Sequence, residues 1–376
     1  MTGNTREHPA LAPFALLGST LSNRLAVAPM TRVSAAPDGT PTGQMRDYYT
    51  EYARGGFGLI ITEGTYTDDV YSQGYLNQPG IVSHDHIQAW KKITTTVHAA
   101  GSRIILQLMH AGALSQGNRY VASTAGPSAV KPRGQKMADY GGSGPWDAPK
   151  EMTLDDIETV VTGFTTAALN ARLAGFDGIE IHAANGYLLD QFLTDYTNQR
   201  TDDYGGTVER RTRLITEIVR RTKEAVADEN FSIGVRISQT KVNDFEHRWA
   251  NGAEDAHVIF SAIAKAGATY LHVASEGRDW IETARFDNGE TITQIARKVS
   301  GLPVIANGGM HAPDQAADLL DGEHADILSI GRGALANPDL PRKLANNQPL
   351  EEFDFKMLHP MATLDSAHAW RQSKGK

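Results

Sequence analysis

Three polar side chains follow a short apolar run within residues 178–206 and could contact a substrate. They are His182, Asn185 and Tyr187, an imidazole, an amide and a phenol within six positions. Strand alternation places His182 on the face opposite its apolar neighbours. A single histidine after a buried strand is more often structural than catalytic. The three residues together, on a loop that contains Gly186, predict one cluster of hydrogen-bond donors.

Two later segments combine glycine with a positive charge and predict a phosphate site. The segment 306–309 reads ANGG, and the segment 331–333 reads GRG; each follows an apolar run. Glycines let a ligand approach backbone N–H groups closely, and arginine binds phosphate through two parallel hydrogen bonds. Either segment alone is also compatible with a tight turn. Together they predict a substrate or cofactor that carries a phosphate.

A repeated pattern of apolar run and amphipathic segment must position these residues. The runs lie at 24–28, 58–62, 103–108, 178–182, 232–237, 270–274, 303–306 and 326–330. One intervening segment shows a helix start at Thr153 with Asp156 and a stop at Gly175. Strand and helix in regular alternation predict an α/β protein, a (β/α)8 TIM barrel formed by residues 1–376 as a single domain. A doubly wound open sheet is the less favoured alternative.

Three regions fall outside the plain repeat. Residues 11–23 read as a β-hairpin ahead of the first strand, and we expect this hairpin to plug the closed end of the barrel. Residues 113–150 are too many for a loop without structure of its own, so we expect a capping insertion, or lid, after the third strand. Residues 355–376 form a C-terminal tail.

In such barrels the reacting groups lie at the carboxyl ends of the strands. Polar or glycine residues stand at several of these ends: Thr31 after Pro29 and Met30, Gly64, Gln107 and Arg236. Thr31 and Gln107 could instead satisfy local backbone groups. Arg236 could instead pair with Glu180, which faces inward on the neighbouring strand.

Composition excludes several classes of function. The formal net charge is −8 and no block of lysine or arginine occurs, so neither nucleic acid nor a membrane surface is an expected partner. The N-terminal segment lacks the order of a signal peptide, which predicts a cytoplasmic protein. Because the chain has no cysteine, it has no thiol nucleophile and no cysteine-ligated metal or iron–sulfur centre. His110 has no second ligand at suitable spacing, so no metal site is expected.

No glycine-rich dinucleotide-binding or P-loop motif occurs, so the barrel itself must hold any cofactor.

Seven segments together resemble the Old Yellow Enzyme family of flavin-dependent ene-reductases. They are LSNRLAVAPMTR, GGFGLIITEGTY, ILQLMHAG, GIEIHAANGYLLDQFLTDYTNQRTDDYGG, GVRIS, ANGGM and SIGRGALANPDL. The resemblance covers nearly the whole chain. It implies a bound FMN, with NADPH or NADH as a transient hydride donor.

The resemblance implies roles for the residues at the strand ends. Thr31 matches the hydroxyl that binds flavin O4, Gln107 the residue at the pyrimidine edge, and Arg236 the cation near N1 and O2. Backbone contacts to the flavin ring are implied for Pro29, Met30 and Gly64. The phosphate site is implied for Gly309, Met310, Gly331 and Arg332.

The resemblance also implies a reaction. His182 and Asn185 match the pair that holds a substrate carbonyl oxygen, and Tyr187 matches the proton donor to the α carbon. Hydride would go from flavin N5 to the β carbon of an activated alkene such as an enone, a maleimide or a nitroalkene. NAD(P)H and the alkene would use the same place in turn.

Several alternatives stay open. The same scaffold could reduce nitro compounds or nitrate esters. A non-redox phosphate-binding barrel would need a base at the mouth, for which Lys241 is the one candidate, and a barrel that only binds ligands is a further possibility. An iron–sulfur dienoyl-CoA reductase is excluded because the chain has no cysteine.

The chain departs from the family pattern in two places. The segment LHVASEG does not match the acidic-proline-arginine pattern of many members, and Thr31 stands where one branch has cysteine. Arg371 resembles a residue that in another branch enters the neighbouring subunit. The sequence leaves the choice between monomer and homodimer open.

Overall fold

The computed structural model describes residues 8–16, 19–275 and 278–375. Parallel strands pair in chain order and close into a barrel, because the last strand pairs with the first. The barrel strands are β3 (Leu25–Val27), β4 (Leu59–Ile61), β6 (Arg103–Met109), β9 (Gly178–Asn185), β10 (Ser232–Lys241), β11 (Tyr270–Val273), β12 (Val304–Asn307) and β13 (Ile327–Ile330). A short strand, β5 (Thr65–Tyr66), adds to β6. The predicted TIM barrel is confirmed.

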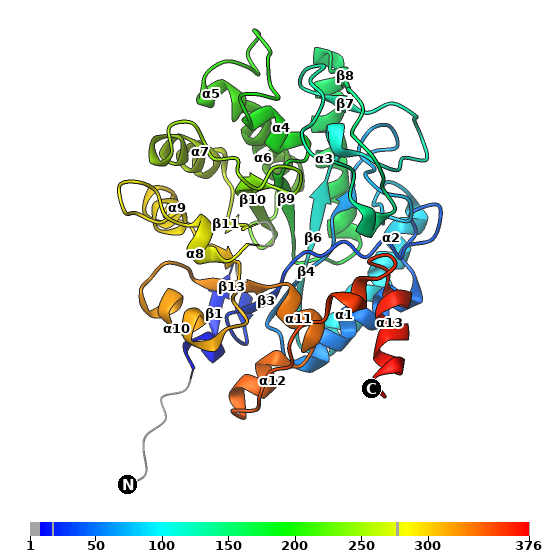
Figure 1. Cartoon of the computed structure of the whole chain (residues 1–376), viewed down its shortest axis with the longest axis vertical. Helices are drawn as coiled ribbons and strands as arrows, with labels where there is room; N and C mark the ends of the chain where they lie inside the picture. Colours follow the sequence, from blue (N-terminus) through cyan, green and yellow to red (C-terminus); the bar gives the residue numbers. More distant parts are fainter. Residues whose placement is uncertain (1–7, 17–18, 276–277, 376) are drawn as a thin grey trace.

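Helices surround the barrel (Figure 1). The main ones are α1 (Gly43–Gly55), α2 (His84–Ala99), α3 (Leu154–Leu173), α6 (Arg213–Val226), α7 (Ala253–Ala266), α9 (Ile292–Ser300) and α10 (Pro313–Asp321). Shorter ones are α4 (Leu188–Leu193), α5 (Val208–Arg211), α8 (Trp280–Thr283), α11 (Arg332–Ala336) and α12 (Leu340–Ala345). The predicted start of α3 is confirmed, since Thr153 and Asp156 form a capping box.

The strands bury side chains on both faces. Ile179 and Ile181 point outward into the core shared with the helices, whereas the interior of the barrel contains a second apolar cluster. This inner cluster includes Leu16 and Leu21 from β1 (Phe14–Leu16) and β2 (Ser19–Leu21), which pair antiparallel. The predicted hairpin therefore closes the barrel from within. Its two leucines contribute about 1.5–3 kcal/mol each through burial.

The insertion between β6 and α3 packs over the open end of the barrel. It contains η2 (Gly112–Leu114), β7 (Ala125–Gly126), η3 (Ala138–Tyr140) and β8 (Lys150–Glu151). Leu114 and Trp146 from this segment share an apolar cluster with Tyr75 and Tyr187. The insertion thus brings apolar side chains to the same end of the barrel as the polar residues predicted above.

The C-terminal tail is ordered around two short elements, η4 (Phe355–Leu358) and α13 (Leu364–Ser373). The buried Arg32 anchors it, because its guanidinium donates to the carbonyls of Ala362 (3.0 Å) and Thr363 (2.8 Å). Arg371 donates to Glu51 of the same chain at 3.0 and 3.1 Å. In this structure, Arg371 is therefore paired with a residue of its own chain.

One further short helix, η1 (Pro9–Leu11), precedes the hairpin. Within the described ranges, no helix has the length and apolar character needed to cross a membrane. Three sequence interpretations fall partly outside the described residues. They concern the N-terminal residues 1–7, positions 17–18 of the predicted hairpin, and positions 276–277 of the LHVASEG segment.

Candidate active site

A cavity of about 690 Å³ opens at the carboxyl ends of the barrel strands. This volume is in the usual range for small-molecule and cofactor sites, roughly 300–1,000 Å³. The cavity is lined by twelve of the residues predicted from the sequence: Pro29, Met30, Thr31, Gln107, His182, Asn185, Tyr187, Arg236, Gly309, Met310, Gly331 and Arg332. Residues from the ends of six strands, or from the loops that follow them, thus converge on one space.

Gly64 is the predicted site residue that does not line this cavity. A Cβ atom at this position would lie 2.5 Å from Met109 Sδ, so a larger residue would displace Met109. The carbonyl of Gly64 accepts a hydrogen bond from Gln78 Nε2 at 2.7 Å. In the structure, Gly64 therefore packs against Met109, which lines the cavity.

His182 lies near the end of β9, directly opposite Arg236 of β10 in the strand register. It is only 4% exposed, and among the described residues its Nδ1 has no hydrogen-bond partner. Burial, together with the charge of Arg236, lowers the pKa of His182 to about 3. The imidazole is therefore neutral near pH 7 and presents one N–H donor and one acceptor nitrogen.

Asn185, the last residue of β9, and Tyr187 flank Gly186 in a tight turn. The φ angles of Asn185 and Gly186 are 68° and 86°, so both residues adopt the left-handed conformation. Asn185 Oδ1 is buried and lacks a hydrogen-bond partner among the described residues. The rings of Tyr187 and His182 lie 5.2 Å apart between centroids. The turn thus directs an amide and a phenol toward the same region as the imidazole.

Tyr187 has a neighbour that the sequence analysis missed. Its hydroxyl hydrogen-bonds the hydroxyl of Tyr75, from the loop after β5. The ring of Tyr75 packs on Tyr140 of the insertion, with 4.8 Å between the ring centroids. Burial, with the nearby Tyr187, raises the pKa of Tyr75 well above the ordinary value of a phenol. Tyr75 therefore remains a neutral hydroxyl next to Tyr187.

A polar layer centred on Glu180 lies inside the barrel. Glu180 is fully buried and accepts hydrogen bonds from Gln107 Nε2 (2.8 Å), His272 Nδ1 (2.8 Å) and the Tyr270 hydroxyl (3.1 Å). Burial alone would raise the pKa of Glu180. His272, Arg236 and Gln107 outweigh that effect and hold it at about 2. Glu180 is therefore a carboxylate that orients Gln107 and balances the charge of Arg236, while Arg236 also lines the cavity.

The two glycine segments predicted to bind phosphate both line the cavity and follow the paired strands β12 and β13. Gly308 and Gly309 have φ angles of 121° and 70°, a conformation that favours glycine. Arg332 opens α11 beside them and its guanidinium lies 5.9 Å from the ring centroid of Phe355. Backbone N–H groups next to a guanidinium suit a phosphate. The donors present here therefore fit the group that the sequence predicts.

Glu63 is a buried carboxyl beside the site that no motif in the sequence had indicated. It accepts hydrogen bonds from the backbone N–H of Arg32 (2.9 Å) and the hydroxyl of Tyr49 (3.2 Å). It thereby fixes the chain that follows Thr31. Burial raises the pKa of Glu63 to about 7, against the opposing effect of Arg32.

This pKa predicts a pH-dependent stability. Because the folded pKa lies above the unfolded value of 4.5, the contribution of Glu63 is complete below pH 4.5 and is lost as pH rises through 7. In the wild-type protein, ionisation of Glu63 should lower the free energy of unfolding by about 1 kcal/mol between pH 6 and 8. We expect Glu63→Gln to lack this part of the decline when unfolding is measured by denaturant titration. Glu224→Gln, which alters an exposed ion pair with Arg220, should keep the wild-type decline. An unchanged slope in Glu63→Gln contradicts the assignment.

Lys241 does not line the cavity. Its ammonium group lies 2.8 Å from both carboxylate oxygens of Asp190, and both side chains are buried. The interpretation of Lys241 as a base at the mouth of a non-redox barrel therefore loses its support.

Several residues that line the cavity were not predicted, because they lie in the insertion, in the loops after β10 and β11, or in the C-terminal tail. They are Met137, Asp139, Tyr140, Val242, Phe245, Arg278, Phe355, Leu358 and Ala362.

The chain matches the NADH:flavin oxidoreductase / NADH oxidase family over residues 10–351. It is 34% identical over 355 residues to a probable flavin mononucleotide-dependent alkene reductase of Leishmania infantum, with 92% of each chain covered. It is 36% identical over 346 residues to the chanoclavine-I aldehyde reductase of Penicillium roqueforti, covering 89% of this chain and 88% of that protein. It spans about half (48%) of an NADH oxidase of Thermoanaerobacter brockii at 33% identity.

Solved structures agree. An old yellow enzyme homologue from Zymomonas mobilis superposes with a TM-score of 0.83 at 31% identity, covering 95% of this chain and 99% of that one. Morphinone reductase in complex with tetrahydroNAD superposes with a TM-score of 0.82 at 30% identity, covering 93% of both chains. The chain therefore belongs to the NADH:flavin oxidoreductase family, together with the old yellow enzyme homologues, and is an oxidoreductase.

Proposed function

We propose that the protein is an FMN-dependent NAD(P)H:alkene oxidoreductase that reduces activated alkenes. The observation that carries this proposal is the convergence of His182, Asn185 and Tyr187 on a cavity that Arg332 and the glycine segments also line. The name of the Leishmania relative, an alkene reductase dependent on flavin mononucleotide, supports the same reaction class.

The residues present fit FMN. The orphaned Nδ1 of His182 is a buried ring nitrogen that a ligand in this cavity could satisfy, and Asn185, whose Oδ1 is also orphaned, carries an NH2 group that can donate to the same ligand. Gln107 and Arg236 would bind the pyrimidine edge, Pro29, Met30 and Thr31 the rest of the ring, and the glycine segments with Arg332 the phosphate. When bound, FMN supplies hydride at N5, which it receives from NADPH or NADH.

The protein's own groups would do the remaining chemistry. His182, neutral because its pKa is about 3, and Asn185 would each donate a hydrogen bond to the carbonyl oxygen of the alkene. These donors withdraw electron density from the double bond and stabilise the negative charge that develops on the oxygen. The β carbon then accepts hydride. Donors fixed before the reaction need no reorganisation, which is the usual origin of such stabilisation.

Tyr187 would complete the reduction by giving its hydroxyl proton to the α carbon. Tyr75 hydrogen-bonds that hydroxyl and would keep it oriented. The alkene gains one hydride and one proton, NAD(P)H loses the hydride, and Tyr187 regains its proton from solvent. Nitro compounds and nitrate esters also present oxygen atoms to His182 and Asn185, so their reduction is the second candidate on the same site.

The cofactor assignment is tested directly on the purified protein. We expect a yellow protein with flavin absorbance near ~450 nm that releases FMN on denaturation. Arg332→Ala should lower FMN affinity because it removes the charged phosphate contact, whereas Arg220→Ala, on the outer surface, should not. Consumption of NADPH or NADH with an enone is measured on the same preparation. A colourless protein that FMN cannot reconstitute overturns the proposal.

A further inference from the structure

The turn that carries Asn185 and Tyr187 stands in an unfavourable backbone conformation. Asn185 and Gly186 are consecutive residues with positive φ. This region is costly for a residue with a side chain, on the order of 1 kcal/mol, even though asparagine tolerates it better than most. A turn of this kind keeps one geometry only where its surroundings fix it. The contacts around residues 185–187 therefore determine where the amide and the phenol point.

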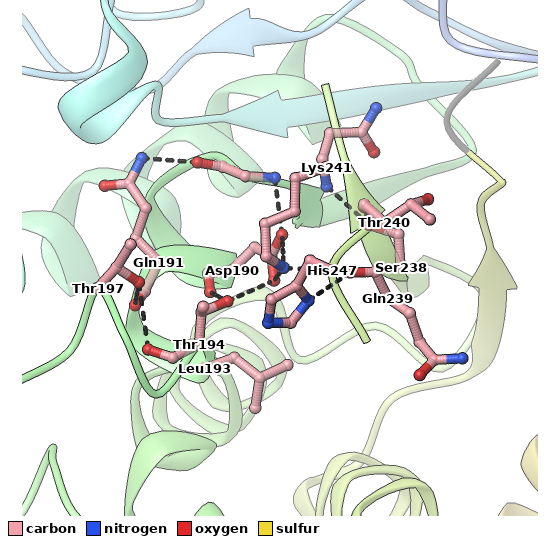
Figure 2. A network of polar contacts seen from close by, with 12 residues as sticks. Asp190, Gln191, Leu193, Thr194, Thr197, Ser238, Gln239, Thr240, Lys241 and His247 are labelled. Atoms are coloured by element: carbon pink, nitrogen blue, oxygen red, sulfur yellow. Dashed lines mark hydrogen bonds and ion pairs between the residues drawn. The ribbon is translucent and has the colours of Figure 1, made fainter. Parts of the chain in front are cut away.

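A buried ion pair lies next to this turn. The Lys241 ammonium contacts both carboxylate oxygens of Asp190 at 2.8 Å, and the two side chains are 2% and 0% exposed. Figure 2 shows Lys241 reaching Asp190 from the end of β10, with Thr194, Gln239 and His247 around the pair. Asp190 belongs to the first turn of α4, directly after Tyr187. The pair therefore joins β10 to the short helix that follows the turn.

The Asp190 carboxylate also contacts the turn itself. Its Oδ2 accepts a hydrogen bond from the backbone N–H of Gly186 at 2.7 Å. A carboxylate held by an ammonium group is a strong acceptor, and such charge-assisted bonds are about twice as strong as neutral ones. The same carboxylate thus binds Lys241 on one side and the centre of the turn on the other.

Other backbone groups of the turn are tied to the same two elements. Gln191 Nε2 of α4 donates to the carbonyl of Gly186 at 2.7 Å. Ser238 Oγ of β10 accepts from the N–H of Asn185 at 2.9 Å, and the N–H of Val242 donates to the carbonyl of Asn185 at 3.1 Å. The turn therefore spans α4 and β10, and the ion pair holds α4 and β10 together.

We propose that Asp190 and Lys241 are positioning residues whose ion pair holds the turn 185–187 in the conformation that directs Asn185 and Tyr187 into the cavity. This inference rests on the proposed function for the roles of those two side chains. Neither Asp190 nor Lys241 lines the cavity, so their effect acts through the turn.

Charge-deleting variants separate positioning from simple stabilisation. Breaking a buried pair on one side leaves an uncompensated charge and is strongly destabilising, whereas removal of both charges is often tolerated. Lys241→Met alone should therefore lower Tm sharply. The double variant Asp190→Asn/Lys241→Met should recover most of that Tm and retain FMN. If the pair only stabilised the fold, the double variant would also recover function.

Two readouts on the double variant test the inference. Amide hydrogen exchange should become at least tenfold faster in the peptide that covers residues 185–187, while the preceding part of β9 keeps its protection. The affinity of the oxidised holoprotein for a para-substituted phenol, whose oxygen would accept hydrogen bonds from His182 and Asn185, should fall tenfold or more, and so should the rate of alkene reduction. Arg103→Met is the control. Arg103 is the first residue of β6 and pairs with Asp177 at 2.9 Å, and neither residue lines the cavity. This control should leave all readouts unchanged.

The outcomes distinguish this inference from the proposed function. Wild-type exchange protection at 185–187 in the double variant overturns the positioning role, whatever reaction the protein catalyses. Wild-type phenol affinity in a double variant with faster exchange also overturns it, because the turn would then not direct the ligand contacts. A failure of the proposed function would instead appear in the wild-type protein, as absence of FMN or of phenol binding.

Discussion

Replacing Tyr187 by phenylalanine is expected to slow alkene reduction by about 10²–10⁴-fold, the usual contribution of a positioned acid. Reduction of the bound flavin by NAD(P)H should change little, because that half of the cycle needs no proton on a carbon atom. The two halves are measured separately by stopped-flow absorbance, first mixing oxidised protein with NAD(P)H and then reduced protein with an enone.

Tyr75→Phe is the matched control for this prediction. It keeps the hydroxyl of Tyr187 and removes only the hydrogen bond that joins the two phenols. We expect a smaller loss, on the order of tenfold, confined to the alkene half, because the acid remains but its orientation is less restricted. Equal slowing of both halves in Tyr187→Phe would contradict the role of Tyr187 as proton donor and indicate a general disturbance of the cavity.

The fold could be predicted because each signal in the sequence is local. Ile179 and Ile181 alternate with Glu180 and His182, and this period of two alone places the polar pair inside the barrel. The capping box at Thr153 likewise needs only residues three positions apart. A barrel then brings strand ends together by its closure, so residues at those ends could be expected to meet in one cavity.

The rest of the site depends on contacts between distant loops, for which one sequence carries no local signal. Tyr75 and Tyr187 are 112 positions apart, and Asp190 and Lys241 are 51 apart. Lys241 illustrates the difficulty, because a lysine at a strand end suggested a reactive base, whereas the fold places a carboxylate beside it.

Loss of His182 and Asn185, the two proposed donors to the substrate carbonyl oxygen, is expected to have the largest effect on ligand binding. Phenols resemble the oxygen-centred anion that forms during alkene reduction, so their affinity reports on His182 and Asn185. A hydrogen bond to a charged group contributes about 1.5–3 kcal/mol, so His182→Ala/Asn185→Ala should weaken phenol binding by about 10²–10⁴-fold. The measurement is titration of the oxidised holoprotein with a para-substituted phenol, followed by its long-wavelength charge-transfer absorbance.

The pH dependence of the same titration tests the protonation state of the donor pair. Since the pKa of His182 is about 3, its imidazole stays neutral between pH 5 and 8, and phenol affinity should rise only as pH approaches the pKa of the phenol itself. A transition near pH 6.5 that disappears in His182→Ala would show that the imidazole titrates in the site. His98→Ala/Asn230→Ala removes the same side-chain types from the outer surface and should bind phenol as wild type does. Phenol affinity that survives loss of His182 and Asn185 would require other donors in the cavity, of which Tyr187 and Arg236 are the nearest candidates.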